Sequence, residues 1–400
     1  MLTPAEAAQR IGQHLPVLPV QSLPIGQCVG AILRENIYAE RDQPPFDRVS
    51  MDGIAVCSAH IATGSRRLRI AGTQAAGDPP LSLPSPDQCI EAMTGAVLPS
   101  GCDAVVPVEH IRVEDGFALI NDNAPVEPRQ NVHARGTDRL QGALLLTAGS
   151  RLQPPDVAVA AGAGMAHLRV SAEPACMVIS TGNELVEPGE PIESWQLRRS
   201  NVYALTAALQ RRGFTRVVDD HLPDDADVLQ QRLAQHLNTH DVLILSGGVS
   251  MGRFDLVPAA LAACGVRQVF HKVAQRPGKP FWFGVAPRGN VVFALPGNPV
   301  STLVCLARYV IPALDRAMGA QSPQQGEKIA LGADIAFKPA LAGFIPVRVQ
   351  IDDSGQRWAQ TVTTNGSGDF AALAGTEGFV ELPPGPNNYA KGFVTALYRW

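Results

Sequence analysis

The sequence predicts a multidomain protein in which an α/β region with a mostly parallel sheet lies between two β-rich regions. The chain has 400 residues, enough for about two or three domains. Between about residues 175 and 320, β-type runs alternate with helical segments, as is typical of parallel sheets with crossover helices. Before and after this region, short β-type runs are broken by many Gly and Pro residues.

Composition excludes several classes of protein. The 33 Lys and Arg residues and 37 Asp and Glu residues give a net charge of −4, which argues against a basic face for nucleic acid. The longest uncharged run, 289–307, is interrupted by Pro296 and Pro299, so we expect no transmembrane helix. The N-terminus lacks the basic start and apolar core of a signal peptide. The 7 cysteines are scattered and include no CxxC pair, which argues against a disulfide framework or a zinc site. We therefore expect a cytoplasmic protein with reduced thiols.

Two helices are expected to bracket the β-rich N-terminal region. Thr3 and Glu6 can form a capping box with Pro4 at the first helical position, which predicts a helix near residues 4–13. A second helix is predicted near 155–164, where two prolines begin an Ala-rich stretch. Short runs between the helices predict strands, among them 102–108 and 117–120.

The α/β region is predicted to alternate strands and helices. The expected strands are 176–180, 214–218, 242–245 and 291–295. The expected helices run from the candidate cap Ser200 to Gly213, over 225–237, and from Pro299 through Tyr309. After about residue 325, the runs 344–351 and 379–382 predict a small terminal domain built of strands.

Polar, glycine-containing loops follow three of the predicted strands. Ligands of parallel sheets bind at the carboxyl ends of the strands, so these loops are the first candidates for a site. Asn298 is a candidate helix N-cap ahead of Pro299, which would leave backbone amides free to hold an anion. A tight turn is the better interpretation of any single loop, but three such loops at one edge favour a ligand that carries phosphate. The loop residues are Thr181, Gly182, Ser246, Gly247, Gly248, Ser250, Pro296, Gly297, Asn298 and Pro299.

Charged residues near these loops fit the same chemistry. Carboxylates beside an anion site can hold a divalent cation that bridges to phosphate oxygens, and the candidates are Glu184, Asp224 and Asp255. Asp224 also stands just before a predicted helix, where an N-cap is at least as good an interpretation. Arg276 and Lys279, in a Pro-Gly turn, suit an oxyanion, although a solvated loop commonly carries such cations.

Short sequence motifs along almost the whole chain, here called strings, carry a family resemblance. Those in the N-terminal half look like turns, and periodicity leaves open whether they reach the sheet. Together, the strings resemble the molybdopterin molybdenumtransferase family, known as MoeA in bacteria and as the E domain of gephyrin and the plant Cnx proteins. They are 50–53 (SMDG), 93–96 (MTGA), 98–99 (LP), 103–106 (DAVV) with Glu109, 136–138 (GTD), 180–185 (STGNEL), 246–252 (SGGVSMG) with Asp255, 277–280 (PGKP), 295–301 (LPGNPVS) and 366–368 (GSG).

The resemblance implies a four-domain organisation. An elongated linker domain would comprise residues 1–44 and 139–174, and an inserted β-rich domain would comprise 45–138. A three-layer α/β domain of the molybdopterin-binding type (175–325) and a C-terminal β barrel (326–400) would follow. Family members are homodimers whose active cleft takes residues from both subunits.

The resemblance also implies a Mg²⁺-dependent transferase of molybdenum cofactor biosynthesis. Its substrates would be adenylated molybdopterin and molybdate, and it would release AMP and leave molybdenum on the dithiolene sulfurs. The implied catalytic residues are Asp52, Thr94, Asp138, Glu184, Asp255 and Lys279, and the implied metal ligands are Glu184, Asp224 and Asp255. The loop residues named above, with Arg276, Ser301, Arg348 and Ser367, would bind pterin, phosphate or molybdate. The implied protein partners are the adenylating enzyme of the pathway and apo-molybdoenzymes.

Several positions depart from the family pattern and leave alternatives open. Arg276 replaces a usual Lys, Arg48 a common Asn, Phe344 a frequent Arg and Glu377 a typical Asn. Arg presents a planar fork where Lys presents a point charge, so a paralogue that inserts tungsten or serves a related cofactor step is one alternative. A non-catalytic scaffold that binds molybdopterin is another, but it would need long linkers and a fused adenylating domain, which these 400 residues do not contain.

Overall fold

The computed structural model describes residues 1–249, 256–321, 326–337 and 340–400, and the chain divides into two compact units. The first unit comprises Met1–Glu35, Ala148–Gln153 and His167–Trp400. The second comprises Asn36–Thr147 and Pro154–Ala166. The first thus combines the α/β region with the C-terminal strands, and the second holds most of the β-rich N-terminal region.

A six-stranded sheet forms the centre of the first unit. Its order is β16 (Val217–Leu222), β13 (Cys176–Thr181), β17 (Val242–Ser246), β21 (Val291–Leu295), β20 (Trp282–Val285) and β18 (Arg267–His271). The pairs from β16 to β21 are parallel, whereas β20 and β18 pair in antiparallel fashion. The predicted mostly parallel sheet is therefore confirmed.

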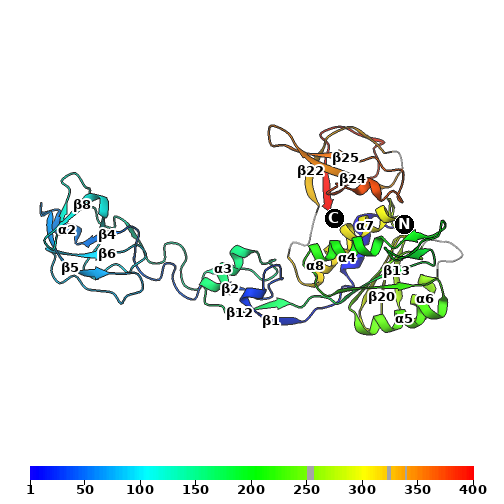
Figure 1. The fold of residues 1–400 in the computed structure, drawn as a ribbon, viewed down its shortest axis with the longest axis horizontal. Helices are drawn as coiled ribbons and strands as arrows, with labels where there is room; N and C mark the ends of the chain where they lie inside the picture. Colours follow the sequence, from blue (N-terminus) through cyan, green and yellow to red (C-terminus); the bar gives the residue numbers. More distant parts are fainter. Residues whose placement is uncertain (250–255, 322–325, 338–339) are drawn as a thin grey trace. The chain divides into compact units, whose positions relative to one another are not determined.

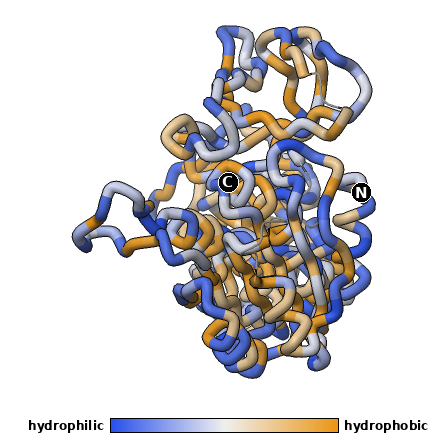
Figure 2. Tube along the Cα trace, turned by 90° about the vertical axis from the view of Figure 1, so that its right-hand side faces the viewer, coloured by the Kyte–Doolittle hydropathy of each residue, from blue (hydrophilic) through white to orange (hydrophobic). Residues whose placement is uncertain are grey.

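Helices cover both faces of this sheet (Figure 1): α5 (Ala226–Thr239) and α6 (Val257–Ala263) on one, α4 (Asn201–Arg211), α7 (Pro299–Cys305) and α8 (Ile311–Ala317) on the other. Successive side chains of a strand point to opposite faces of the sheet, so each face has its own hydrophobic core. Val178 and Phe293 pack with α4, α7 and α8, whereas Ile179 and Leu245 pack with α5 and α6. Figure 2 shows hydrophobic residues concentrated inside this region.

The C-terminal part of the first unit contains a closed β barrel. Its strands in order are β24 (Ala342–Ile351), β25 (Arg357–Thr361), β22 (Glu327–Leu331), β28 (Val394–Arg399) and β26 (Gly378–Leu382), and the pairing of β24 with β26 closes the ring. β19 (Gln275–Arg276), from the α/β region, pairs with β24. The predicted barrel is confirmed.

Smaller elements of the first unit include three two-stranded pairs: β1 (Val20–Pro24) with β12 (His167–Ser171), β14 (Leu185–Val186) with β15 (Leu197–Arg198), and β23 (Ile335–Ala336) with β27 (Asn388–Tyr389). The unit also contains the short 3-10 helices Ile25–Gln27 and Ala371–Leu373 and the π-helical turn Leu306–Val310.

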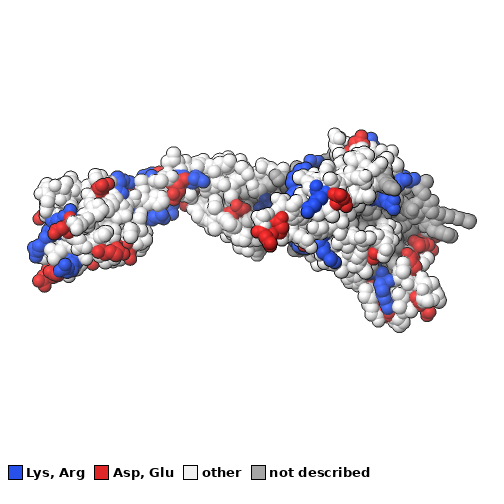
Figure 3. Space-filling model, turned by 90° about the horizontal axis from the view of Figure 1, so that it is seen from above, with Lys and Arg blue, Asp and Glu red and all other residues white. Residues whose placement is uncertain are grey.

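A six-stranded sheet also forms the second unit. Its order is β7 (Ala104–Pro107), β4 (Gly53–Val56), β6 (Gln88–Ala92), β5 (Arg67–Gln74), β9 (Phe117–Ile120) and β8 (Ile111–Glu114). The unit also contains the pairs β3 (Arg48–Val49) with β10 (Val132–His133) and β2 (Ile37–Tyr38) with β11 (Leu144–Leu146), the helices α2 (Ser58–Ile61) and α3 (Pro154–Gly162), and the 3-10 helix Val108–His110. Figure 3 shows acidic and basic side chains interspersed over the face that it draws, in keeping with the near-balanced charge.

Helix caps follow the sequence in part. The capping box of α1 (Pro4–Gly12) is confirmed, because Thr3 Oγ1 accepts from the Glu6 N–H at 3.2 Å and the Thr3 N–H donates to Glu6 at 2.7 Å. Ser200 occupies the N-cap position of α4, as predicted, but its side chain makes no capping hydrogen bond. The carboxylate that caps α5 belongs to Asp225 and not to Asp224, because the helix begins one residue later than the Asp224 interpretation requires.

Other boundaries also differ slightly from the expectation. The strand expected at 214–218 begins only at Val217, because Phe214 lies just after α4 and its N–H donates to the carbonyl of Leu209 in that helix. The helix predicted near 155–164 is α3, which begins at Pro154. Within the described ranges, every helix is too short or too polar to cross a lipid bilayer.

Candidate functional site

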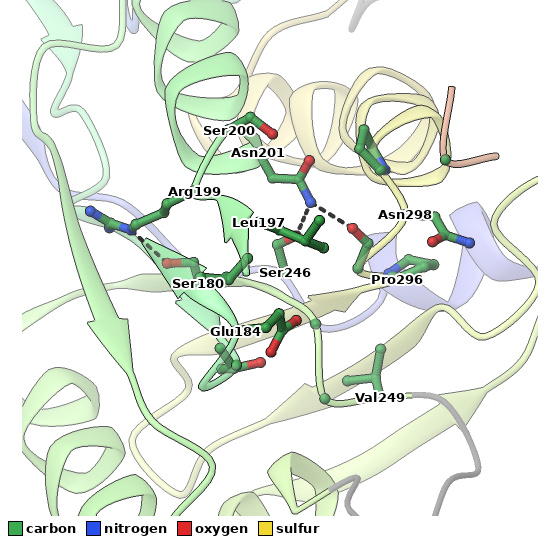
Figure 4. Close-up of a pocket in the computed structure, with 18 of the residues that line it drawn as sticks. Ser180, Glu184, Leu197, Arg199, Ser200, Asn201, Ser246, Val249, Pro296 and Asn298 are labelled. Carbon is green, nitrogen blue, oxygen red and sulfur yellow. Dashed lines mark hydrogen bonds between the residues drawn. The ribbon is translucent and has the colours of Figure 1, made fainter. Parts of the chain in front are cut away.

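Three loops meet at the carboxyl edge of the parallel sheet. Ser180 pairs with Ser246, and Ser246 pairs with Leu295, so β13, β17 and β21 end at the same level. The loops that follow these strands line a cavity of about 770 Å³ (Figure 4). The predicted site residues that the structure brings together there are Thr181, Gly182, Glu184, Asp224, Ser246, Gly247, Gly248, Pro296, Gly297, Asn298 and Pro299.

The backbone at Gly247 and Gly248 leaves no room for a side chain. Both residues have positive φ angles, +105° and +67°. A Cβ atom on Gly247 would lie 2.9 Å from the carbonyl oxygen of Thr181, and one on Gly248 would lie 2.6 Å from Val257. The two glycines therefore allow the loop after β17 to pack against the end of β13.

Two carboxylates belong to the cavity lining. Glu184 folds back over Gly182, where an added Cβ would lie 2.5 Å from Oε2, and within the described residues its carboxylate has no cationic partner. Asp224 is held by its backbone, because its N–H donates to Asn183 Oδ1 at 3.0 Å. Both carboxylates offer the oxygen donors that Mg²⁺ prefers.

The described residues include two of the three predicted metal ligands. Asp255 and the predicted binding residue Ser250 lie outside the described residues. Among the residues that the structure describes, no group of three or more His, Cys, Asp or Glu side chains could hold a metal ion. Glu184 and Asp224 are thus the described part of the predicted ligand set.

Sequence analysis missed Asn201 and Arg199, which both line the cavity. Asn201 connects the loops, because its Nδ2 donates to Ser246 Oγ at 2.9 Å and to the Gly297 carbonyl at 2.7 Å (Figure 4). Arg199 is only 8% exposed, and all its nitrogens donate to oxygens of Ser180, Glu187, Asp219 or Asp220. Arg199 therefore shapes the cavity wall and does not act as a free cation. The polar string 199–201 at the start of a predicted helix was the signal for both residues.

The start of α7 is less open than expected. Pro299 occupies the first turn, as predicted. The Asn298 side chain makes no capping hydrogen bond, and its Nδ2 donates to Ser367 Oγ at 2.8 Å. The Val300 N–H donates to the Ser367 carbonyl at 3.1 Å. The expectation of free amides was therefore wrong at Val300, where the loop of the barrel that carries Ser367 takes the hydrogen bond.

A second cavity, of about 980 Å³, lies between the α/β region and the barrel of the first unit. Arg276, Lys279, Ser301 and Ser367 all line it, and Pro280, Pro296 and Asn298 line both cavities. The turn that carries the two cations is held by the buried Gln275, whose Nε2 donates to the Pro277 carbonyl at 3.2 Å and whose Oε1 accepts from the Tyr309 hydroxyl. Burial raises the pKa of Tyr309 well above its usual value, so the hydroxyl keeps its proton.

Phe344 and Glu377, the two barrel residues that depart from the family pattern, both contact other residues of the barrel. Phe344 is 1% exposed and packs edge to face on Phe379, with ring centroids 5.2 Å apart. Glu377 accepts a hydrogen bond from the Val349 N–H at 2.8 Å. Arg348, predicted to bind molybdate or phosphate, donates to the Ala374 carbonyl at 3.1 Å and does not belong to the lining of either cavity described above.

In the second unit, β3 brings predicted residues from distant parts of the chain together. The Gly95 N–H donates to the Val49 carbonyl at 2.9 Å, which places the string 93–96 beside the string 50–53. Asp52 Oδ1 accepts from both the N–H and the hydroxyl of Thr94, each at 2.7 Å. These hydrogen bonds, the backbone one first, lower the pKa of Asp52.

Asp138 lies in the turn after β10, in the same unit. The Asp138 N–H donates to the Gln43 carbonyl at 2.9 Å, which fixes the backbone of the turn. Its Oδ1 atom lies 3.0 Å from Nε2 of His133, a residue that sequence analysis did not single out. Asp138 therefore has a side-chain partner on β10.

Comparisons with known proteins cover the whole chain. Three family models match it in order: the MoeA N-terminal region (domain I and II) over residues 2–164, a probable molybdopterin binding domain over 177–316, and the MoeA C-terminal region (domain IV) over 328–398. The chain is 38% identical over 401 residues to a molybdopterin molybdenumtransferase of Synechocystis sp., covering 100% of both chains. It is 31% identical over 403 residues to one of Haemophilus influenzae, covering 99% of this chain and 98% of the other. A crystal structure of a molybdopterin biosynthesis MoeA protein from Pyrococcus horikosii is similar, with a TM-score of 0.83, 29% identity, and coverage of 100% of this chain and 99% of the other.

Proposed function

Because the chain belongs to the molybdopterin molybdenumtransferase family, as its motifs predicted, we propose that it inserts molybdenum from molybdate into adenylated molybdopterin with release of AMP. The observation that carries this proposal is the first cavity, where Glu184 and Asp224 share one lining with the loops 247–248 and 296–298. Carboxylates beside loops suited to phosphate are the arrangement in which Mg²⁺ bridges protein and phosphate oxygens.

The residues of the cavity fit Mg²⁺ because it is lined by two carboxylates, Glu184 and Asp224, that have no cationic partner among the described residues. Glu184, Asp224 and Asp255 would hold the ion. When bound, it would polarise the phosphoanhydride between the pterin phosphate and AMP for cleavage by water. The cations of Arg276 and Lys279 in the second cavity would bind molybdate or phosphate and stabilise the negative charge that develops.

The family resemblance supports a homodimeric enzyme whose cleft takes residues from both subunits. Asp52, Thr94 and Asp138 would then act at the sheet edge of the other subunit. The substrate would come from the adenylating enzyme of the pathway, and the product would pass to apo-molybdoenzymes. The division into four domains and the cytoplasmic location stay predictions of the sequence.

The test is AMP release by the purified protein with adenylated molybdopterin and Mg²⁺. Molybdate, tungstate and no oxyanion form the three arms. We expect release with molybdate and a product that activates an apo-molybdoenzyme. Release only with tungstate would favour the divergent paralogue, and tight binding without release in any arm would favour the scaffold.

A further inference from the structure

Three side chains of the second unit form a continuous hydrogen-bonded chain. Arg48 and His133 are direct partners in the antiparallel pair of β3 and β10. The Arg48 Nη2 atom lies 3.2 Å from His133 Nδ1, and His133 Nε2 lies 3.0 Å from Asp138 Oδ1. These hydrogen bonds connect β3 and β10 to the turn that carries Asp138. They include Arg48, which departs from the family pattern.

Arg48 sets the direction of the hydrogen bonds. A guanidinium is always protonated and can only donate, so His133 Nδ1 must be the acceptor. The ring proton then resides on Nε2, which donates to the Asp138 carboxylate. An Asn at position 48, the common family residue, offers both donors and an acceptor and would not impose this tautomer.

The nearest acidic neighbour of Arg48 in sequence is already paired with other groups. The carboxylate of Asp47, next to Arg48 in sequence, is engaged by Arg129 at 2.5 and 2.9 Å and by the Arg135 N–H at 2.9 Å. Within the described residues, Asp138 Oδ2 makes no hydrogen bond. One oxygen of Asp138 is therefore held by His133, and the other is available to a ligand.

We propose that Arg48 and His133 are positioning residues, which fix the Asp138 carboxylate through Oδ1 and present Oδ2 to the substrate. The proposal rests on the proposed function, in which Asp138 acts in the cleft. It assigns the departure at position 48 a role at the site, carried out through His133.

The first test reads the His133 ring directly, without substrate. ¹⁵N NMR of the full-length protein reports the ring tautomer, and the His133 signals are those missing from the His133→Gln spectrum. We expect the neutral Nε2–H tautomer, and in Arg48→Met a loss of this preference. Arg112→Met, which removes an exposed arginine of β8, is the matched control and should leave the ring unchanged. An Nδ1–H tautomer, or unchanged ring signals in Arg48→Met, would overturn the proposal.

The second test asks whether His133 acts through Asp138. We expect His133→Ala to lower kcat for AMP release about tenfold in the otherwise unchanged protein, but less than about twofold in an Asp138→Asn background. His133→Gln, whose amide N–H can still donate, should retain most of the activity. Equal losses in both backgrounds would contradict a positioning role. An unmodified protein that releases no AMP at all would contradict the proposed function. The NMR measurement of the His133 tautomer would still test whether Arg48 donates to Nδ1 and Nε2 donates to Asp138.

Discussion

Thr94 holds Asp52 through two hydrogen bonds to the same oxygen, Oδ1, at 2.7 Å each. One comes from the backbone N–H and the other from the hydroxyl. The hydroxyl of Thr94 is therefore engaged by the carboxylate, which makes Thr94 a residue that positions Asp52 and favours its ionised form. Both residues are exposed, and Asp52 Oδ2 makes no hydrogen bond within the described residues, so this oxygen is open to a ligand.

Thr94→Val should raise the pKa of Asp52 towards its usual value. The variant loses the hydroxyl bond but keeps the backbone bond, which is the larger cause of the lowered pKa. A lowered carboxyl pKa stabilises the fold above the unfolded-state pKa, and this contribution disappears as the pH falls through the folded-state value. We expect the Asp52 titration, measured by carboxyl ¹³C NMR, to move to higher pH. Thr94→Ser, which keeps the hydroxyl, is the control, and an unshifted titration in Thr94→Val would refute the assignment.

Glu184→Gln should abolish AMP release without loss of stability. The exposed carboxylate has no cationic partner in the described part of the chain, so its neutralisation removes only a ligand for Mg²⁺. We expect turnover to fall by at least about 100-fold, with an unchanged urea unfolding curve. Glu193→Gln, which neutralises another exposed carboxylate in the loop before β15, should retain full activity. A well-folded Glu184→Gln protein with normal turnover would remove Glu184 from the site.

Mixed dimers can show whether the cleft is shared between subunits. Glu184→Gln and Asp52→Asn proteins should each be inactive alone. If the cleft takes Glu184 from one subunit and Asp52 from the other, each mixed dimer contains one intact cleft. Random subunit exchange should then restore about a quarter of the unmodified activity. No recovery, in a mixture whose exchange is verified by mass spectrometry, would place both residues in the same subunit's cleft.

The sheet edge was predictable because it depends on local patterns. Apolar runs ended by Gly, Ser and Asn place the loops after β13, β17 and β21, and parallel strands bring their ends together. The cap of α5 shows the limit of this reasoning. Asp224 and Asp225 are adjacent acids, and only the backbone path decides that Asp225 caps the helix.

Long-range contacts could not be predicted in this way. Asn201 bonds to Ser246, 45 residues away, and to Gly297, 96 residues away, and no local pattern reports such pairs. Ser367 was predicted as an anion ligand, but nothing local shows that its carbonyl takes the Val300 N–H. The sequence therefore predicts which loops meet at the sheet edge better than it predicts which polar groups of these loops are hydrogen-bonded to other parts of the protein.

Phe344→Ala should destabilise the protein by about 3–5 kcal/mol, as is usual for the loss of a buried aromatic ring. Phe344 is buried, and its ring packs on Phe379 in the core between α7 and the barrel. Phe344→Arg, which introduces the frequent family residue, should cost at least as much because a charge would enter this core. Urea unfolding measures both variants, and Phe344→Leu is the milder control. An Arg variant as stable as the unmodified protein would show that the site accepts a cation here.

Lys279→Ala should weaken the response to molybdate and leave binding of the adenylated pterin largely intact. Lys279 lines the second cavity with Arg276 but does not line the first, which the loops after β13, β17 and β21 form. Loss of one of two neighbouring cations should raise the molybdate concentration for half-maximal AMP release by about tenfold, because the ammonium acts on the oxyanion as a point charge. Lys279→Arg keeps the charge, so its half-maximal molybdate concentration should lie between those of the unmodified protein and Lys279→Ala. If Lys279→Ala leaves the molybdate titration unaltered but weakens pterin binding, the second cavity serves the pterin phosphate instead of the oxyanion.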